Sequence, residues 1–195
     1  TMVGLFSYCI FALAYTQIAK RLGGIGSLLS SWFIFLIASL VAVHIELPLI
    51  ATWILSMLAV GATWKLIPKL PHPPALNAHP RWDLSVRMVS AGILVLTLTE
   101  LARFLGPQWS GVLTPFPVAT SILMTAAHLK QGYASSMHVL SGVMLGLLGF
   151  STFCVLYSYG LLHWGLSLSI LVALGACAIL QGLLLKFVLS KTHVQ

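Results

Sequence analysis

Acidic residues are almost absent from this chain, which has three of them among 195 residues against ten lysines and arginines. Charged residues of both signs amount to 7%, whereas a soluble domain carries about a quarter. So little charge cannot cover an exterior that faces water. Because 59% of the residues are hydrophobic and the mean hydropathy is +1.01, the sequence predicts an integral membrane protein whose surroundings are the lipid bilayer.

The signatures of several enzyme classes are also missing. The chain has no glycine-rich phosphate loop, no nucleophile triad pattern and no dinucleotide-binding fingerprint. Three acids are too few for a carboxylate-bound metal hydrolase. The three cysteines lie in apolar runs without pair spacing and are interpreted as packing residues. A haem protein or a membrane enzyme would need histidines that converge in the fold. We therefore predict no enzyme activity, no catalytic residues, no cofactor and no metal.

The positive charge of +7 does not predict nucleic-acid binding, because the basic residues are spread singly between apolar runs and form no stripe. We interpret them as markers of membrane topology. No cleavable leader pattern precedes the first apolar run.

Seven apolar segments have about the length that crosses a bilayer, and they predict an all-α, polytopic membrane helix bundle. The segments lie at about 2–19, 27–43, 47–66, 84–105, 109–128, 134–157 and 165–188. A linker with five prolines, 67–83, separates three spans in 1–66 from four spans in 84–195. The other connections are short, so consecutive spans should be antiparallel neighbours.

The distribution of basic residues supports seven crossings. With seven, nine of the ten basic residues fall on one side: Lys20, Arg21, Lys65, Lys69, Arg81, Arg87, Lys130, Lys186 and Lys191. Arg103 falls on the other. If the fifth segment were a re-entrant loop, the division would be six against four. The sequence therefore predicts seven crossings, with the N-terminus outside and the C-terminus in the cytoplasm.

A repeat is hidden in the apolar segments. Residues 2–15, MVGLFSYCIFALAY, match residues 144–157, MLGLLGFSTFCVLY, at a constant offset of 142 that also pairs Gly23 with Gly165 and Ser27 with Ser169. Five spans lie within this offset, so the matched helices should run in opposite directions. Inverted repeats of this kind are typical of secondary transporters. The register further predicts about two spans before residue 1; the alternative is that Met2 is the native start and the duplication is incomplete.

The stretch LARFLGPQWSGVLTPFPVATSIL, followed by LSGVMLGLLGF, resembles a pattern in uncharacterised bacterial inner-membrane proteins, which have a related copy in the N-terminal half. The resemblance covers residues 84–160 well and implies no substrate. At fold level the predicted duplication is similar to carriers built from five plus five inverted spans, which is an analogy of fold alone. Gly142 and Gly146 in this stretch have the spacing typical of close helix packing.

Pro115 and Pro117 interrupt the fifth predicted span. Each removes a helical amide donor and disfavours helical geometry in the residue before it. The carbonyls that lose their partners are too costly to face lipid, so the break around Thr114 should face protein or water. A helix that starts after Pro117 would present free amides to an anion. The alternative is a packed kink without a functional role.

Glu100 lies within the fourth predicted span, where an ionisable residue is a functional hypothesis by default. Arg103 is three residues further, on the same helical face, and the alternative is a structural ion pair between the two. The predicted substrate-binding residues are Thr97, Glu100, Arg103, Gln108, Thr114, Pro115 and Pro117.

Two functions remain open. The first is a secondary transporter of a small solute, with an anion as one option, whose polar cavity is lined by these residues. The second is a non-catalytic membrane subunit or scaffold that packs against partner helices. The expected partners are the bilayer and a small-molecule solute, with a homo-oligomer as an allowed state.

Overall fold

The computed structural model describes residues 2–44, 47–70, 81–106 and 114–192, and this part of the chain contains seven helices and no strand. The prediction of an all-α protein is therefore confirmed. The helices are α1 (Gly4–Ile18), α2 (Gly24–Ala42), α3 (Leu49–Leu66), α4 (Arg81–Leu105), α6 (Val118–Gln131), α7 (Tyr133–His163) and α8 (Leu166–Thr192).

Four helices of the described residues are long and apolar enough to cross a bilayer, namely α2, α3, α7 and the segment Leu166–Lys186 of α8. Helices satisfy their own backbone hydrogen bonds, which is what an apolar surrounding demands. The expectation of a membrane protein agrees with these four candidate spans. Helix α1, the apolar part Met88–Glu100 of α4 and the 14-residue α6 are shorter.

Three helices begin at the first residue after a proline. Helix α3 begins at Leu49, directly after Pro48. Helix α4 begins at Arg81, directly after Pro80, and α6 begins at Val118, directly after Pro117. The first three residues of α4, 81–83, belong to the predicted linker 67–83, most of which is outside the described residues. The fifth predicted segment, 109–128, becomes helical only at Val118. Proline is tolerated before a helix or in its first turn but not inside it, which explains all three boundaries.

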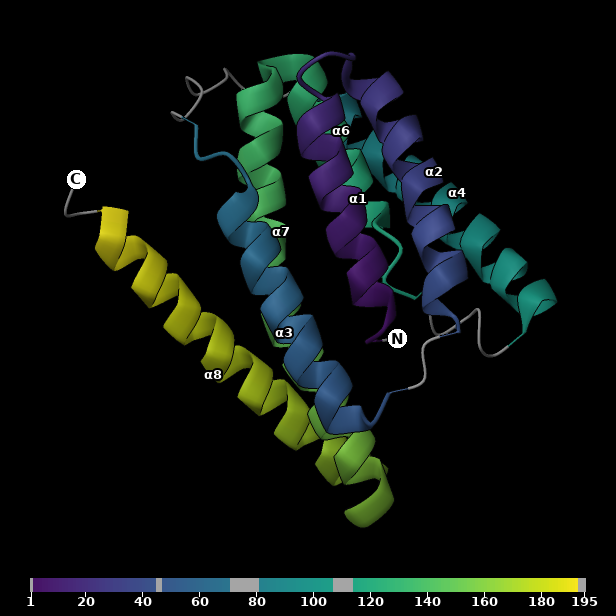
Figure 1. The fold of residues 1–195 in the computed structure, drawn as a ribbon, viewed down its shortest axis with the longest axis vertical. Helices are drawn as coiled ribbons and strands as arrows, with labels where there is room; N and C mark the ends of the chain where they lie inside the picture. Colours follow the sequence, from purple (N-terminus) through teal and green to yellow (C-terminus); the bar gives the residue numbers. More distant parts are fainter. Residues whose placement is uncertain (1, 45–46, 71–80, 107–113, 193–195) are drawn as a thin grey trace.

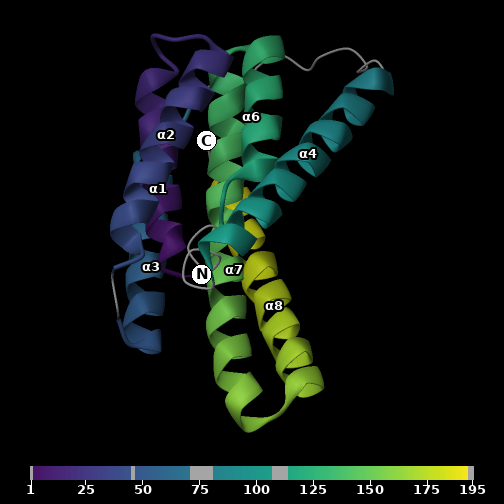
Figure 2. The same cartoon turned by 90° about the vertical axis from the view of Figure 1, so that its right-hand side faces the viewer.

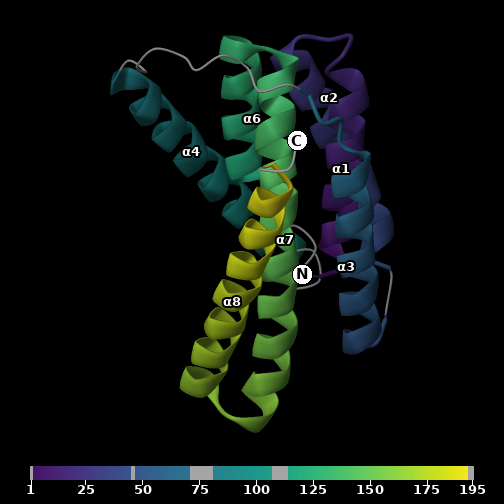
Figure 3. The same ribbon diagram turned by 90° about the vertical axis from the view of Figure 1, so that its left-hand side faces the viewer.

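Consecutive helices alternate in direction (Figure 1). Helices α1, α3, α6 and α8 rise in this view, and α2, α4 and α7 descend, so α1 and α7 run in opposite directions. Helix α4 crosses α6 at an angle and diverges from it toward the N-terminal end of α4 (Figures 2 and 3). The turns α1–α2 and α6–α7 lie at the same end of the bundle.

Helix α1 supplies much of the core. Leu5, Phe11, Ala12 and Tyr15 have no exposed surface, because α1 packs between α2 and α3 and reaches α6 and α7 through side-chain hydrogen bonds. Helix α8 packs along α7 at the periphery (Figure 3), and most of its described side chains are exposed. Exposed leucines on such a helix are what a lipid surrounding accommodates.

Candidate functional site

Residues Thr114–Pro117 form a non-helical segment directly before α6, as the two prolines predict. Pro117 occupies the N-cap position with φ −77° and ψ 54°. The amide of Val118 donates to the carbonyl oxygen of Phe116 at 2.7 Å, and the amide of Ser121 donates to that of Pro117 at 2.8 Å. The backbone thus turns sharply once and then enters the helix.

The proline segment faces the bundle. Pro115 and Pro117 are buried, and the ring of Phe116 lies 5.5 Å from that of Trp32 and 5.2 Å from that of Phe35, centroid to centroid. Both partners belong to α2. The segment is therefore packed against protein, as expected from the cost of open backbone in lipid. These contacts also agree with the alternative of a packed kink.

Two tyrosines connect α1 to α6. The hydroxyl of Tyr8 bonds Oγ1 of Thr120 at 2.5 Å, and the hydroxyl of Tyr15 bonds Nδ1 of His128 at 2.8 Å. The tyrosines are seven residues apart and their partners eight, about two helical turns in each case. This register requires α1 and α6 to run parallel, in agreement with Figure 1.

Two further bonds connect the same halves of the chain. The indole Nε1 of Trp32 on α2 donates to Oγ of Ser121 at 2.8 Å, and the hydroxyl of Tyr133 on α7 donates to the carbonyl oxygen of Thr16 at 3.0 Å. Interhelical hydrogen bonds in an apolar bundle are worth about 0.6 kcal/mol on average and up to about 1.7 kcal/mol. Four of them fix the α1–α2 pair against α6 and α7.

A cavity of about 370 Å³ lies between α2, α4 and α6, next to the bond between Trp32 and Ser121. This volume is within the range of small-molecule sites. Its surface is mainly apolar: five of the ten lining residues are aliphatic, three carry a hydroxyl group, and Lys130 is the one that is charged. The lining residues are Leu28, Trp32, Ser90, Leu94, Ser121, Ile122, Thr125, Ala126, Leu129 and Lys130.

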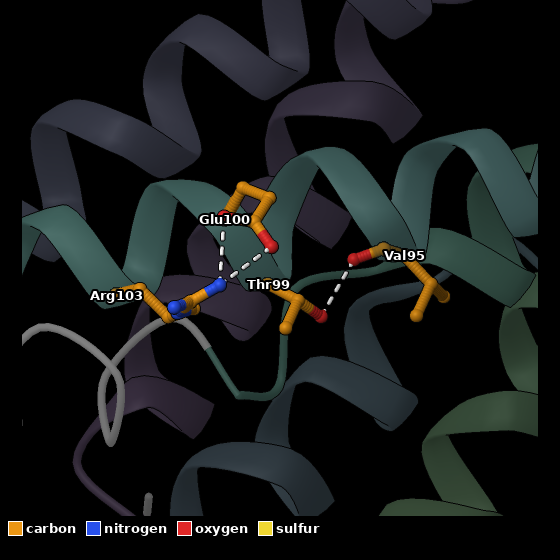
Figure 4. A network of polar contacts seen from close by, with 4 residues as sticks. All are labelled: Val95, Thr99, Glu100 and Arg103. Carbon is orange, nitrogen blue, oxygen red and sulfur yellow. Dashed lines mark hydrogen bonds and ion pairs between the residues drawn. The ribbon is translucent and has the colours of Figure 1, made fainter.

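Glu100 and Arg103 form an ion pair on α4 (Figure 4), with Nη1 of Arg103 at 3.1 and 3.2 Å from the two carboxylate oxygens. Their side chains are 59% and 73% exposed, respectively. The hydroxyl of Thr97, also exposed, donates to the carbonyl oxygen of Ile93 at 2.8 Å. The structural pairing that the sequence allowed is therefore present, on the outer face of the helix.

The structure does not bring the predicted site residues together around the cavity. None of the six that it describes is among the lining residues. Thr114 is exposed while Pro115 and Pro117 are buried, and Gln108 lies outside the described residues. A role of these seven residues in substrate binding stays a prediction.

The cavity and the hydrogen-bonded pairs involve residues that the sequence did not single out. Tyr8 and Tyr15 are seven residues apart in an apolar run, so they share one helical face. Ser121, Thr125 and His128 have spacings of four and three, which also places them on one face. This periodic placement of polar residues is the signal in the sequence that marks the site.

Searches against protein-family models, curated proteins and solved structures find no match to this chain. Within the described residues, no group of three histidine, cysteine or acidic side chains is arranged to hold a metal ion. Functional inference therefore depends on the cavity and on the hydrogen bonds beside it.

Proposed function

We propose that this chain is a membrane carrier, a secondary transporter of a small solute, and that the solute binds between α2, α4 and α6. The observation that supports it is the cavity of about 370 Å³, in which hydroxyl and indole groups occur within an apolar helix bundle. Helix α6, which forms one wall, starts inside the bundle after a packed proline segment. Interrupted helices beside a solute site are typical of secondary transporters.

The carrier would cross the bacterial inner membrane seven times, with its N-terminus outside and its C-terminus in the cytoplasm. The alternating helix directions support this arrangement (Figure 1). Lys20 and Arg21 follow α1, and Lys130 lies in the last turn of α6, so these three cations belong to the end of the bundle that the positive-inside rule assigns to the cytoplasm.

The inverted repeat is part of the same proposal. Helix α2 begins at Gly24 and α8 at Leu166, and these starts are 142 residues apart, the offset found in the sequence. The pairs α1–α2 and α7–α8 each pack together, and α1 runs opposite to α7 (Figure 1). The chain would thus consist of two related units of opposite orientation, 1–66 and 84–195.

A two-step experiment tests the carrier. Thermal unfolding of the purified protein in detergent is first screened against monocarboxylates, dicarboxylates, phosphate esters, nucleosides and sugars, because a ligand that binds the native state raises the unfolding temperature. Uptake of each stabilising compound into proteoliposomes is then measured. The variants Ser121→Ala and Thr125→Val should weaken uptake, whereas Thr99→Val, at an exposed position of α4, should not. If no compound both stabilises the protein and enters the vesicles, the carrier proposal fails.

The second candidate is a non-catalytic subunit or scaffold. The observation that favours it is the position of α8, which packs mainly on α7 and leaves a long apolar surface exposed. A partner helix from another chain or from a second copy would cover this surface. Stoichiometric co-purification of such a partner in mild detergent, without uptake of any solute, would favour this function over the carrier.

A further inference from the structure

We propose that the cavity between α2, α4 and α6 binds a single-chain anionic amphipath, a fatty carboxylate, with its alkyl chain beside Trp32 and its carboxylate at Lys130. As a substrate assignment this inference rests on the proposed carrier function and names the solute class. As a binding site it can be measured without transport.

The shape of the cavity wall fits an extended chain. Six lining residues come from α6, and they recur at intervals that follow one helical face: Ser121, Ile122, Thr125, Ala126, Leu129 and Lys130. From Ser121 to Lys130 this face is about 13 Å long, at 1.5 Å per residue. An elongated ligand that lies along this face of α6 can contact all six residues, whereas a compact ligand cannot.

The chemistry of the walls fits an alkyl chain. Leu28 of α2 and Leu94 of α4 line the cavity together with Ile122 and Ala126 of α6. The indole of Trp32 also lines the cavity, and its nitrogen donates a hydrogen bond to Ser121, the first residue of the lining face of α6. Burial of each methylene group is favourable by an amount that corresponds to about a fourfold change in affinity, so affinity should rise with chain length until the space is filled.

The charge at the other end selects the head group. Lys130 is exposed at the C-terminal end of α6 and is the one charged residue among the lining residues. A lysine ammonium is a compact charge that attracts a carboxylate without demanding one geometry. At this end α4 has diverged from α6 (Figure 2), and Leu129 is 61% exposed. A ligand can therefore enter from the side, chain first, and leave its head group in water.

The position of Trp32 permits a direct test, because bromine quenches tryptophan fluorescence only at close range. A variant that keeps Trp32 and carries phenylalanine at 53, 64, 82, 109 and 164 is titrated in detergent with 12-bromododecanoate. We expect saturable quenching that dodecanoate reverses by competition. Because 2-bromododecanoate places its bromine near Lys130, it should compete for the site yet quench Trp32 far less. The neutral 12-bromododecanol should bind several-fold more weakly.

Two variants examine the two ends of the site. Ala126→Phe fills the cavity and should abolish the saturable part of the quenching. Lys130→Gln should weaken the binding of 12-bromododecanoate by about three- to fivefold, as expected for an exposed ion pair. The affinity for 12-bromododecanol should not change. Lys65→Gln is the matched control, since Lys65 also ends a helix but does not line the cavity. If the single-tryptophan protein does not fold, loss of the saturable quenching on Trp32→Phe in the natural chain gives the same information.

Quenching that does not saturate, that is equal for the acid and the alcohol, or that survives Ala126→Phe would overturn the inference. Failure of the carrier proposal looks different. In that case saturable binding is found but no solute crosses proteoliposome membranes, and the fatty-carboxylate site remains as a lipid-binding site. If a different solute is taken up and no quenching is observed, the carrier proposal stands and the assignment of a fatty carboxylate fails.

Discussion

The hydroxyl of Tyr15 on α1 lies 2.8 Å from Nδ1 of His128 on α6 and joins residues that are 113 positions apart. The ring of Tyr15 has no exposed surface, so the bond lies within the bundle, where water does not easily replace either partner. The two residues hold the first helix of the N-terminal half against the helix that forms one wall of the cavity.

Tyr15→Phe keeps the buried ring and removes the hydroxyl. We expect the free energy of unfolding to fall by about 1 kcal/mol, within the range measured for interhelical bonds in membranes, because Nδ1 of His128 loses its partner. Thermal unfolding in detergent measures the change. Tyr159→Phe is the matched control, since Tyr159 is exposed on α7. Equal losses in the two variants would contradict a specific role for the bond.

Gly149 on α7 leaves room for the side chain of Gln181 on α8. Nε2 of Gln181 donates to the carbonyl oxygen of Gly146 at 2.8 Å, and a methyl group at Gly149 would meet Cγ and Cδ of Gln181 at 3.0 Å. Gly149→Ala should therefore displace Gln181 and cost about 1 kcal/mol of stability. Gly142→Ala, where an added methyl group meets nothing within 4 Å, should be neutral.

The pair Gly149→Ala and Gln181→Ala gives a second measurement of the same contact. Once Gln181 is shortened, the methyl group at Gly149 has nothing left to displace. The cost of the double variant should therefore be less than the sum of the two single costs. Additive costs would show that Gln181 and Gly149 do not act on each other.

Leu22 and Trp164 are exposed, they occupy the turns α1–α2 and α7–α8, and they are 142 residues apart, so they correspond in the proposed repeat. If the two units have opposite orientations, these turns lie on opposite sides of the membrane. In a chain without its natural cysteines, Trp164→Cys should react with an impermeant maleimide in intact spheroplasts. Leu22→Cys should react only after the membrane is opened. Labelling of both from the same side would exclude the inverted arrangement.

The ion pair between Glu100 and Arg103 should contribute little to stability, because exposed pairs are worth about 0–1 kcal/mol. We expect Glu100→Gln to change the free energy of unfolding by less than about 0.5 kcal/mol, and Arg103→Gln to behave alike. Uptake measured on the same samples decides between the two interpretations of the pair. A loss of uptake at unchanged stability would assign Glu100 to solute handling, whereas retained uptake would leave a structural pair.

The sequence was sufficient for the helices and their interruptions, because both depend on local chemistry. Runs of apolar residues define the helices, and Pro80 and Pro117 define where two of them begin. The contacts between helices were not readable in the same way. The apolar residues of α1 follow no amphipathic pattern, so only its few polar residues mark the buried face, and its tyrosines were not assigned to α6. In a lipid surrounding, the usual contrast between a polar outer face and an apolar inner face is lost.

Glu100 illustrates the same difficulty. An acid within an apolar run was expected to face an interior, yet the side chain of Glu100 is 59% exposed and pairs with Arg103 on the same helix (Figure 4). The spacing to Arg103 correctly indicated the pair, because neighbours three residues apart share a helical face. The tilt of α4 away from α6 depends on packing that no single segment encodes.

Pro117→Ala tests whether the start of α6 shapes the cavity. The proline sets the end of the non-helical segment and places Phe116 between Trp32 and Phe35. Alanine supplies an amide donor and favours the helix, so α6 should extend toward its N-terminus and withdraw Phe116 from α2. We expect a small gain in helical circular dichroism, a red shift of the Trp32 emission in the single-tryptophan chain and weaker uptake. Pro48→Ala is the matched control, because Pro48 precedes α3 in the same N-cap position, on a helix that does not line the cavity. If Pro117→Ala changes neither the Trp32 emission nor uptake, the proline segment is a packed kink, and the shape of the cavity does not depend on it.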